Sequence, residues 1–392
     1  MVVADGTQPL SRVSTSKSLP ILFRPDTSTV EADAEIAPVQ QFHSQLPGFA
    51  PTPLHTLEEL AKEIGVKAVF LKDESSRLGL PAFKILGASW GCFRAITTRL
   101  RLSPTASLAE VRDAAQKAGI KLYTASAGNH GRALAAMARI LCIPARIYVP
   151  NSTSAEAARL IESEGAIVVR SELSYDETVT LAWQASQISH EGLFVQDASF
   201  EGYHDIPKWI VQGYSTLLKE VEQQLSEKGS KPDLIVTPVG VGSLAHAVVL
   251  HCKSENRQCA VMTVEPETAP CLYTSLKLGK PTSVRTAHTI MEGLNCGTVS
   301  MDVFADVSAG VDACAAVSDF QAHRGVQYLA DYNISSGPCG GASVAALRKL
   351  AACDRRPHWF TDTAIVVILS TEGHRKYIEP VEFSATDTPD LF

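Results

Sequence analysis

The most informative segment of the chain reads Lys72-Asp73-Glu74-Ser75-Ser76-Arg77-Leu78-Gly79-Leu80-Pro81-Ala82-Phe83-Lys84-Ile85-Leu86-Gly87. It joins residues 68–72, which predict a strand, to the helical pattern of residues 83–100, and it places Lys84 among apolar neighbours at the helix start. A lysine in apolar surroundings has a lowered amine pKa, which suits it to form a Schiff base. A lysine is also unfavourable beside the positive end of a helix dipole. A lone lysine is nevertheless more often a solvated side chain, so Lys84 needs support from other segments.

Strand and helix patterns alternate along most of the chain. Further strands are predicted for residues 121–126, 145–149, 166–170, 193–196, 234–239, 260–264, 313–317 and 364–369. Further helices are predicted for residues 54–64, 131–141, 175–190, 206–225, 244–251, 320–330 and 341–352, and Thr153 and Glu156 have capping-box spacing at the start of another. This alternation indicates an α/β fold whose parallel sheets are covered on both faces. Residues 1–50 show no period and are expected to form an arm across the surface or a partner subunit.

A second segment, Ser126-Ala127-Gly128-Asn129-His130-Gly131, lies between a predicted strand and a predicted helix. Its small residues let the backbone approach a ligand, and the helix start offers N–H donors. Asn129 could donate a hydrogen bond to a phenolate oxygen. Taken alone, these residues are better explained by a helix cap at Asn129-His130 and a turn at Gly128.

A third segment, Thr237-Pro238-Val239-Gly240-Val241-Gly242-Ser243-Leu244-Ala245, turns from a predicted strand into a helix. A glycine-rich turn of this kind forms a phosphate cradle from backbone N–H groups. The same spacing fits a dinucleotide-binding turn, which requires an acidic residue about 20 positions later, and Glu265 lies near enough to keep that alternative open. A nicotinamide enzyme would leave Lys84 and the Asn129 segment without a role.

Composition limits the classes of function. The 392 residues carry a net charge of −7 and no run of lysine or arginine, which argues against a nucleic-acid partner or an acidic membrane. The apolar runs are far too short to span a bilayer, and no secretory signal is recognised. The nine cysteines form no Cys-x-x-Cys pair and no metal-ligand spacing, so we expect a cytoplasmic protein with reduced thiols and no metal site.

Taken together, the three segments and their order in the chain resemble those of the fold-type II pyridoxal-phosphate enzymes, which include serine and threonine dehydratases and cysteine synthases. The first segment narrows the resemblance to the diaminopropionate ammonia-lyase family. Further matches to that family are Gln196-Asp197, Glu201-Gly202-Tyr203, Ile206-Pro207, Trp209-Ile210, Gln212-Gly213-Tyr214, Val264-Glu265-Pro266, Cys271-Leu272-Tyr273, Thr289-Ile290-Met291, Gly293-Leu294-Asn295-Cys296-Gly297 and Ser370-Thr371-Glu372-Gly373.

The resemblance implies a two-domain α/β fold with parallel-rich sheets flanked by helices and with pyridoxal 5'-phosphate between the domains. The large domain would comprise residues 1–87 and 201–392, with residues 1–50 as its N-terminal arm. The small domain would comprise residues 88–200. The resemblance also implies a homodimer and a small-molecule amino-acid substrate.

The same resemblance implies roles for individual residues. Lys84 would hold the cofactor as a Schiff base and then act as the base on the substrate's Cα proton. Asp197 would bind or protonate the leaving β-amine, with a structural ion pair as the alternative. The other residues implied in cofactor binding are Phe83, Asn129, Gly240, Val241, Gly242, Ser243, Leu244 and Ser370, with Thr371 as an alternative to Ser370. Those implied in substrate binding are Ser126, Ala127 and His130.

The implied reaction is a carbon–nitrogen lyase reaction, the α,β-elimination of 2,3-diaminopropionate to pyruvate and ammonia. Ala127 stands where the lyases have an aspartate implicated as the base for the D-isomer, so the L-isomer is the expected substrate. Ala127, the altered segment 335–341 and Glu292, where a smaller residue is usual, keep two alternatives open: dehydration of L-serine or L-threonine, and β-replacement. A non-catalytic homologue that only binds a ligand is a further alternative.

Overall fold

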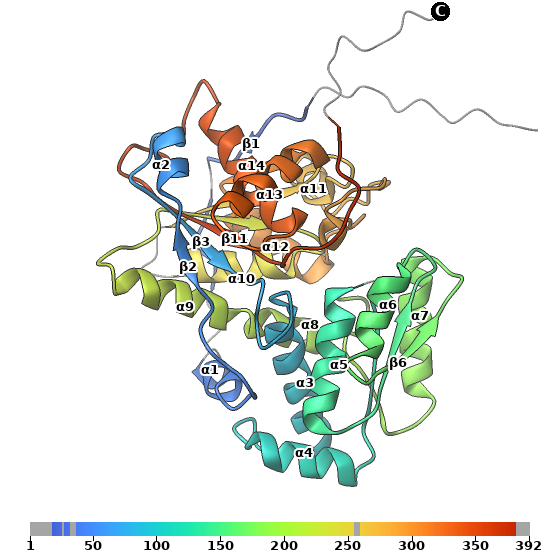
Figure 1. Ribbon diagram of the computed structural model, residues 1–392. Coiled ribbons are helices and arrows are strands. Elements are labelled where there is room, and N and C mark those ends of the chain that lie inside the picture. The colour runs from blue at the N-terminus through green and yellow to red at the C-terminus, as the bar shows by residue number, and fades with distance from the viewer. Residues whose placement is uncertain (1–17, 26, 32–36, 127, 255–258, 382–392) are drawn as a thin grey trace, which may run out of the picture.

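The computed structural model describes residues 18–25, 27–31, 37–126, 128–254 and 259–381. Within them the strands form two separate sheets, one of seven strands and one of four. Figure 1 shows the larger sheet with its helices in the upper half of the molecule and the elements of the smaller sheet, in green, in the lower half. The chain therefore builds two α/β units, and the site segments lie where strands of both sheets end.

The larger sheet has the strand order β1-β10-β9-β8-β11-β3-β2. Its strands are β1 (Leu22–Phe23), β10 (Ala313–Val317), β9 (Ala260–Pro266), β8 (Leu234–Pro238), β11 (Ile365–Ser370), β3 (Ala68–Asp73) and β2 (Leu54–Thr56). The inner strands pair in parallel, whereas β1 and β2 pair antiparallel at the two edges. Strands β8 to β11 are buried along their whole length, in keeping with their largely apolar sequences.

The smaller sheet has the strand order β6-β5-β4-β7 and is entirely parallel. Its strands are β4 (Lys121–Ala125), β5 (Ala145–Val149), β6 (Ile167–Arg170) and β7 (Gly192–Phe194). All four come from one continuous part of the chain inside residues 88–200. The boundaries given above for the two domains remain a prediction.

Helices cover the faces of both sheets. In the described part of the chain they are α1 (Ala37–His43), α2 (Glu58–Ile64), α3 (Lys84–Leu100), α4 (Leu108–Lys117), α5 (Asn129–Leu141), α6 (Ala155–Glu162), α7 (Tyr175–Gln187), α8 (Asp205–Gly213), α9 (Ser215–Ser226), α10 (Ser243–Cys252), α11 (Cys271–Leu278), α12 (Met301–Gly310), α13 (Asp319–Asp331) and α14 (Pro338–Ala351). None of the described helices is long and apolar enough to pass through a membrane.

Several predicted elements need correction. Residues 54–64 do not form one helix, because Leu54–Thr56 pair with β3 as an edge strand before α2 begins. The helix predicted for residues 206–225 is divided at Tyr214 into α8 and α9. The cap of α6 is Ser154, whose hydroxyl accepts from the N–H of Ala157, and not the pair Thr153 and Glu156.

The N-terminal fifty residues are not wholly irregular. Of the described ones, 37–43 form α1, and Leu22–Phe23 pair with Ala313–Cys314 at the edge of the chain's own larger sheet. Residues 1–17, 26 and 32–36 lie outside the described residues. Helices α4, α11 and α12 were not predicted, although Ser107 and Glu110 form a capping box at the start of α4 that the sequence offers as a signal.

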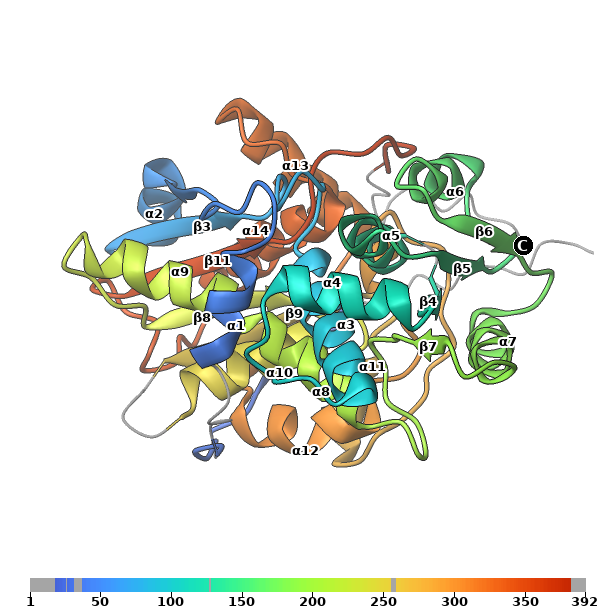
Figure 2. The same ribbon diagram turned by 90° about the horizontal axis from the view of Figure 1, so that it is seen from below.

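Helix α3 connects the two units and carries Lys84 at its first position. Most of its residues are buried, and it packs against α5 and α8. Figure 2 shows it between the strands of the two sheets. At Gly87 a Cβ atom would lie 2.6 Å from the ring of Tyr214 and 2.8 Å from Ile210, so glycine allows this close approach to α8. The tight packing fixes the start of α3, and with it the lysine.

Candidate active site

Lys84 and Asp197 form the centre of the candidate site. The Nζ atom of Lys84 donates to Oδ2 of Asp197 over 2.6 Å, although the two residues are 113 positions apart. Their side chains are 19% and 7% exposed, so the pair is largely shielded from water. The Phe83 ring lies beside the amine, with its centroid 5.4 Å from Nζ. The fold therefore brings together the two residues that the sequence assigned to catalysis.

The pKa predicted for Lys84 from its apolar neighbours is wrong in direction. Burial does lower the pKa of this amine, but the charge of Asp197 and its hydrogen bond raise the pKa more, so the net result is a raised pKa. For Asp197, burial raises the pKa, while Lys84 and His130 lower it to a value below its usual range. Each charge stabilises the other, which favours a charged amine beside a charged carboxylate.

The Asn129 segment begins α5 and faces this pair. The N–H groups of Gly128 and Gly131 donate to the Ser126 hydroxyl at 3.2 and 2.9 Å, so this side chain fixes the loop. His130 lies with Nε2 3.0 Å from the Val195 carbonyl and with Nδ1 3.9 Å from Oδ2 of Asp197. The Nδ1 atom is buried without a hydrogen-bond partner in the described structure. The predicted substrate residue Ala127 lies outside the described residues.

The glycine-rich turn 240–244 follows β8 and leads into α10. Gly242 has a φ of +98°, a conformation that favours glycine, and a Cβ atom there would lie 3.0 Å from Val303 and 3.1 Å from Val299. A Cβ atom at Gly240 would lie 2.9 Å from the Gly293 carbonyl. The first N–H groups of α10 have no carbonyl partner within the helix. Together with the positive end of the helix dipole they form a site for an anion such as a phosphate.

Tyr214, between α8 and α9, has a buried hydroxyl that suits a phosphate bound at the glycine-rich turn. Its hydroxyl is buried and has no hydrogen-bond partner among the described residues. Burial raises its pKa to about 12, and both Lys84 and Ser243 lie close enough to act on that pKa. The unpaired hydroxyl therefore lies between the lysine and the glycine-rich turn, where a bound phosphate oxygen could accept from it. The sequence matched Tyr214 to the family but assigned it no role.

Ser370 ends β11 inside the molecule. It is fully buried, and its hydroxyl lies 2.8 Å from that of Ser336. Thr371 is the alternative to Ser370, and its carbonyl accepts from the N–H of Phe83 at 3.3 Å. The pairing with Ser336 was not predicted, because the segment 335–341 departs from the family pattern and lies more than thirty positions away.

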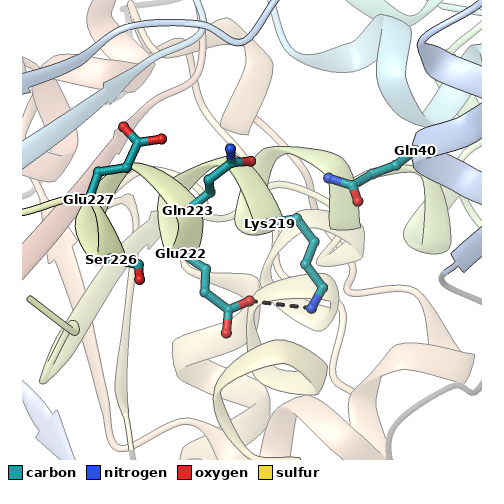
Figure 3. Close-up of a pocket in the computed structure, with 6 residues that line it drawn as sticks. All are labelled: Gln40, Lys219, Glu222, Gln223, Ser226 and Glu227. Atoms are coloured by element: carbon teal, nitrogen blue, oxygen red, sulfur yellow. Dashed lines mark hydrogen bonds and ion pairs between the residues drawn. The ribbon is translucent and has the colours of Figure 1, made fainter. Parts of the chain in front are cut away.

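A surface cavity elsewhere in the molecule is not part of the candidate active site. An open surface cavity of about 480 Å³ lies along α9 and is lined by Gln40, Lys219, Glu222, Gln223, Ser226 and Glu227 (Figure 3). It contains none of the residues of the three segments. Its side chains are polar, and Lys219 already pairs with Glu222 at 3.3 Å. No group of three or more potential metal ligands was found among the described residues.

Comparison with known proteins gives the class of this chain. A model of the pyridoxal-phosphate dependent enzymes matches residues 46–371. The diaminopropionate ammonia-lyase of Escherichia coli K12 is 32% identical over 368 residues, which cover 90% of this chain and 91% of the relative. That of Salmonella typhimurium is 33% identical over 359 residues, which cover 86% and 88%. The crystal structure of the Escherichia coli enzyme in complex with D-serine aligns with a TM-score of 0.81 at 30% identity, covering 90% of this chain and 93% of the other.

The chain therefore belongs to the pyridoxal-phosphate dependent enzymes of fold type II. Within that class it belongs to the diaminopropionate ammonia-lyase family. The fold class and the cofactor expected from the sequence, pyridoxal 5'-phosphate, are confirmed.

Proposed function

We propose that this protein is an ammonia-lyase that converts L-2,3-diaminopropionate and one water molecule to pyruvate and two molecules of ammonia. The observation that carries the proposal is the Lys84–Asp197 pair, 2.6 Å apart, with His130 of the Asn129 segment 3.9 Å from the same carboxylate oxygen. The named relatives are diaminopropionate ammonia-lyases that match along 90% and 86% of the chain. We also expect a cytoplasmic homodimer that acts on a small amino acid.

The residues around this pair suit the cofactor. Lys84 would attach it, the N–H groups of residues 240–244 would hold its phosphate, and Asn129 and Ser370 would contact the ring hydroxyl and the ring nitrogen. Phe83 would pack beside the ring. When bound, the cofactor supplies an acceptor for the electron pair released at the substrate's Cα.

Protons move through the lysine and the carboxylate. Once Nζ is released from the cofactor, it can remove the Cα proton of the substrate. Its hydrogen bond to Oδ2 of Asp197 offers a route by which a proton can reach the leaving β-amine. His130, with Nδ1 3.9 Å from the same oxygen, adds a polar group beside this route. The N–H groups at the start of α5 would bind the substrate carboxylate.

The assay that tests the proposal uses purified protein loaded with pyridoxal 5'-phosphate. L- and D-2,3-diaminopropionate, L-serine and L-threonine are supplied in parallel, and keto acid and ammonia are measured. We expect pyruvate with two ammonia from the L-isomer and a rate about 100-fold or more lower from the D-isomer, since loss of a positioned base costs on the order of 10²–10⁴. Faster turnover of L-serine or L-threonine would instead make the protein a dehydratase. A coloured protein that forms no keto acid from any of them would point to β-replacement.

Asp197→Asn tests the role of the carboxylate. We expect kcat for L-2,3-diaminopropionate to fall about 100-fold or more, because the proton route from Nζ is lost. The pKa of Lys84 should also fall, since the charge of Asp197 raises it. Binding of pyridoxal 5'-phosphate to the cofactor-free protein needs the neutral amine, so its pH dependence should move to lower pH.

The matched control is Asp302→Asn, which removes a carboxylate paired with the exposed His204 at 2.7 Å. It should leave both kcat and the pH dependence of cofactor binding unchanged. If Asp197→Asn behaved like this control, the Lys84–Asp197 contact would be only a structural ion pair.

A further inference from the structure

Glu372 is a buried carboxylate that the proposed mechanism does not use. It lies two residues beyond the end of β11 and is only 5% exposed. Its Oε2 atom accepts from Nδ2 of Asn129 at 3.2 Å, and its Oε1 atom accepts from the N–H of Cys339 at 3.3 Å. Nε of Arg375 lies 3.5 Å from Oε1. The side chain thus joins the start of α5 to the large-sheet unit.

The contact with Asn129 fixes the orientation of its amide. A carboxylate can only accept hydrogen bonds, so the amide must present its nitrogen, and not its oxygen, to Glu372. The Nδ2 group carries two N–H bonds, and Glu372 takes one of them. The other is left to face a second acceptor. Without Glu372, this contact would no longer hold the Asn129 amide with its nitrogen, and not its oxygen, on this side.

The backbone of Glu372 is tied to the segment that carries the lysine. Ala82 and Glu372 form an antiparallel bridge. On either side of it, the N–H of Phe83 donates to the Thr371 carbonyl at 3.3 Å and the N–H of Gly373 donates to the Pro81 carbonyl at 2.8 Å. Glu372 therefore links Asn129 to the segment that carries Lys84.

The loop at Gly337 leaves space for the Glu372 side chain. A Cβ atom at Gly337 would lie 2.8 Å from Cγ and from Oε1 of Glu372, and the N–H of Gly337 donates to the Glu372 carbonyl at 2.9 Å. The Ser336–Ser370 contact lies next to this point. Glu372 thus contacts both the loop at Gly337 and the start of α5.

We propose that Glu372 is a positioning residue for the cofactor, acting by holding the Asn129 amide so that one N–H of Nδ2 is directed to the ring hydroxyl. This inference rests on the proposed cofactor site. It assigns to Glu372 no proton transfer and no contact with the substrate.

Glu372→Gln tests this role most directly, because glutamine keeps the shape of the side chain and changes only its charge and one acceptor group. Both carboxylate oxygens accept from donors, Asn129 on one side and Cys339 on the other, so a glutamine must turn its NH₂ group toward one of these donors. We expect the dissociation constant of pyridoxal 5'-phosphate to rise about 10- to 100-fold, the range for losing a hydrogen bond to a charged group. The absorption maximum of the bound cofactor should shift.

A double-mutant cycle with Asn129→Ala tests whether Glu372 acts through Asn129. If it does, the double variant should bind the cofactor no more weakly than the weaker of the two single variants. The control is Glu63→Gln, which removes the charge of an exposed carboxylate paired with Arg348 at 2.7 Å and should leave cofactor binding unchanged. Thermal unfolding of each cofactor-free variant shows whether the fold is kept.

Three outcomes would overturn the inference. One is a Glu372→Gln variant with wild-type cofactor affinity and absorption maximum. Another is full additivity of the two single effects, which would mean that Glu372 acts independently of Asn129. The third is a wild-type protein that binds no pyridoxal 5'-phosphate, which would overturn the cofactor site as well. A protein that binds the cofactor normally but forms no pyruvate would overturn only the proposed reaction, since binding and absorption would still measure the role of Glu372.

Discussion

Replacing Lys84 by alanine is expected to lower kcat for L-2,3-diaminopropionate by about 10⁴-fold or more. One atom, Nζ, both attaches the cofactor and removes the Cα proton, and losing a residue that acts as nucleophile or base costs on the order of 10⁴–10⁶ in kcat. Pyruvate release measures the rate. Borohydride reduction of the wild-type protein followed by peptide mass analysis should place the cofactor's mass on the peptide that contains Lys84.

Lys84→Ala also leaves the buried carboxylate of Asp197 without its cation, so a loss of activity could reflect a disturbed fold. Lys84→Arg separates the two effects. Arginine keeps the positive charge beside Asp197 but stays protonated and cannot attach the cofactor. We expect Lys84→Arg to unfold like the wild type and to be as inactive as Lys84→Ala. Lys219→Ala, which removes a surface lysine paired with Glu222, should be fully active. Turnover and cofactor absorbance that survive in Lys84→Ala would contradict the proposed function.

The elements that could be predicted from the sequence are those whose apolar pattern is decided locally. Strands β5 and β10 begin and end at the predicted residues, because each is an apolar run bounded by turn signals. Strand β2 was mistaken for the start of a helix, since only its pairing with β3 makes it a strand. The helix divides at Tyr214, directly after Gly213, where a Cβ atom would lie 2.5 Å from the Leu86 carbonyl of α3.

The candidate site divides in a similar way. Lys84, Asn129 and the turn 240–244 lie in short motifs whose chemistry can be recognised in isolation, and their roles in the site remain predictions. The direction of the Lys84 pKa could not be predicted from its neighbours in the chain, because it depends on Asp197, 113 residues away. Glu372 reaches Asn129 across 243 residues, and no spacing in the sequence indicates that contact.

Arg77→Ala is expected to cost about 3–5 kcal/mol in the free energy of unfolding, the range for breaking a fully buried ion pair. Arg77 is completely buried and donates to Glu74 at 2.6 and 2.8 Å and to Glu220 at two distances of 2.7 Å. Lys72 is the second cation of this cluster and donates to Glu220 at 2.7 Å. Two cations thus balance two carboxylates, and removing Arg77 leaves one negative charge buried without compensation.

The cluster also holds the segment that leads to Lys84. Arg77 and Leu80 exchange two backbone hydrogen bonds of 2.9 Å around Leu78 and Gly79, which have φ values of 53° and 77°. A non-glycine residue at such a φ is strained, so this turn persists only if the surroundings hold it. The guanidinium provides that support by joining the turn to Glu220 of α9.

Urea unfolding of the cofactor-free protein, followed by circular dichroism and by fluorescence so that a two-state fit can be justified, measures the cost of Arg77→Ala. Arg348→Ala is the matched control, because Arg348 binds Glu63 with two hydrogen bonds of 2.7 and 2.8 Å but on the surface. Its cost should be about 1 kcal/mol or less. Arg77→Lys should fall between the two, since a lysine keeps the charge but cannot bridge both carboxylates with the same fork of donors. If Arg77→Ala cost no more than Arg348→Ala, the turn before Lys84 would have to be held by its backbone pairing with residues 371–373, and the buried charges would contribute little to it.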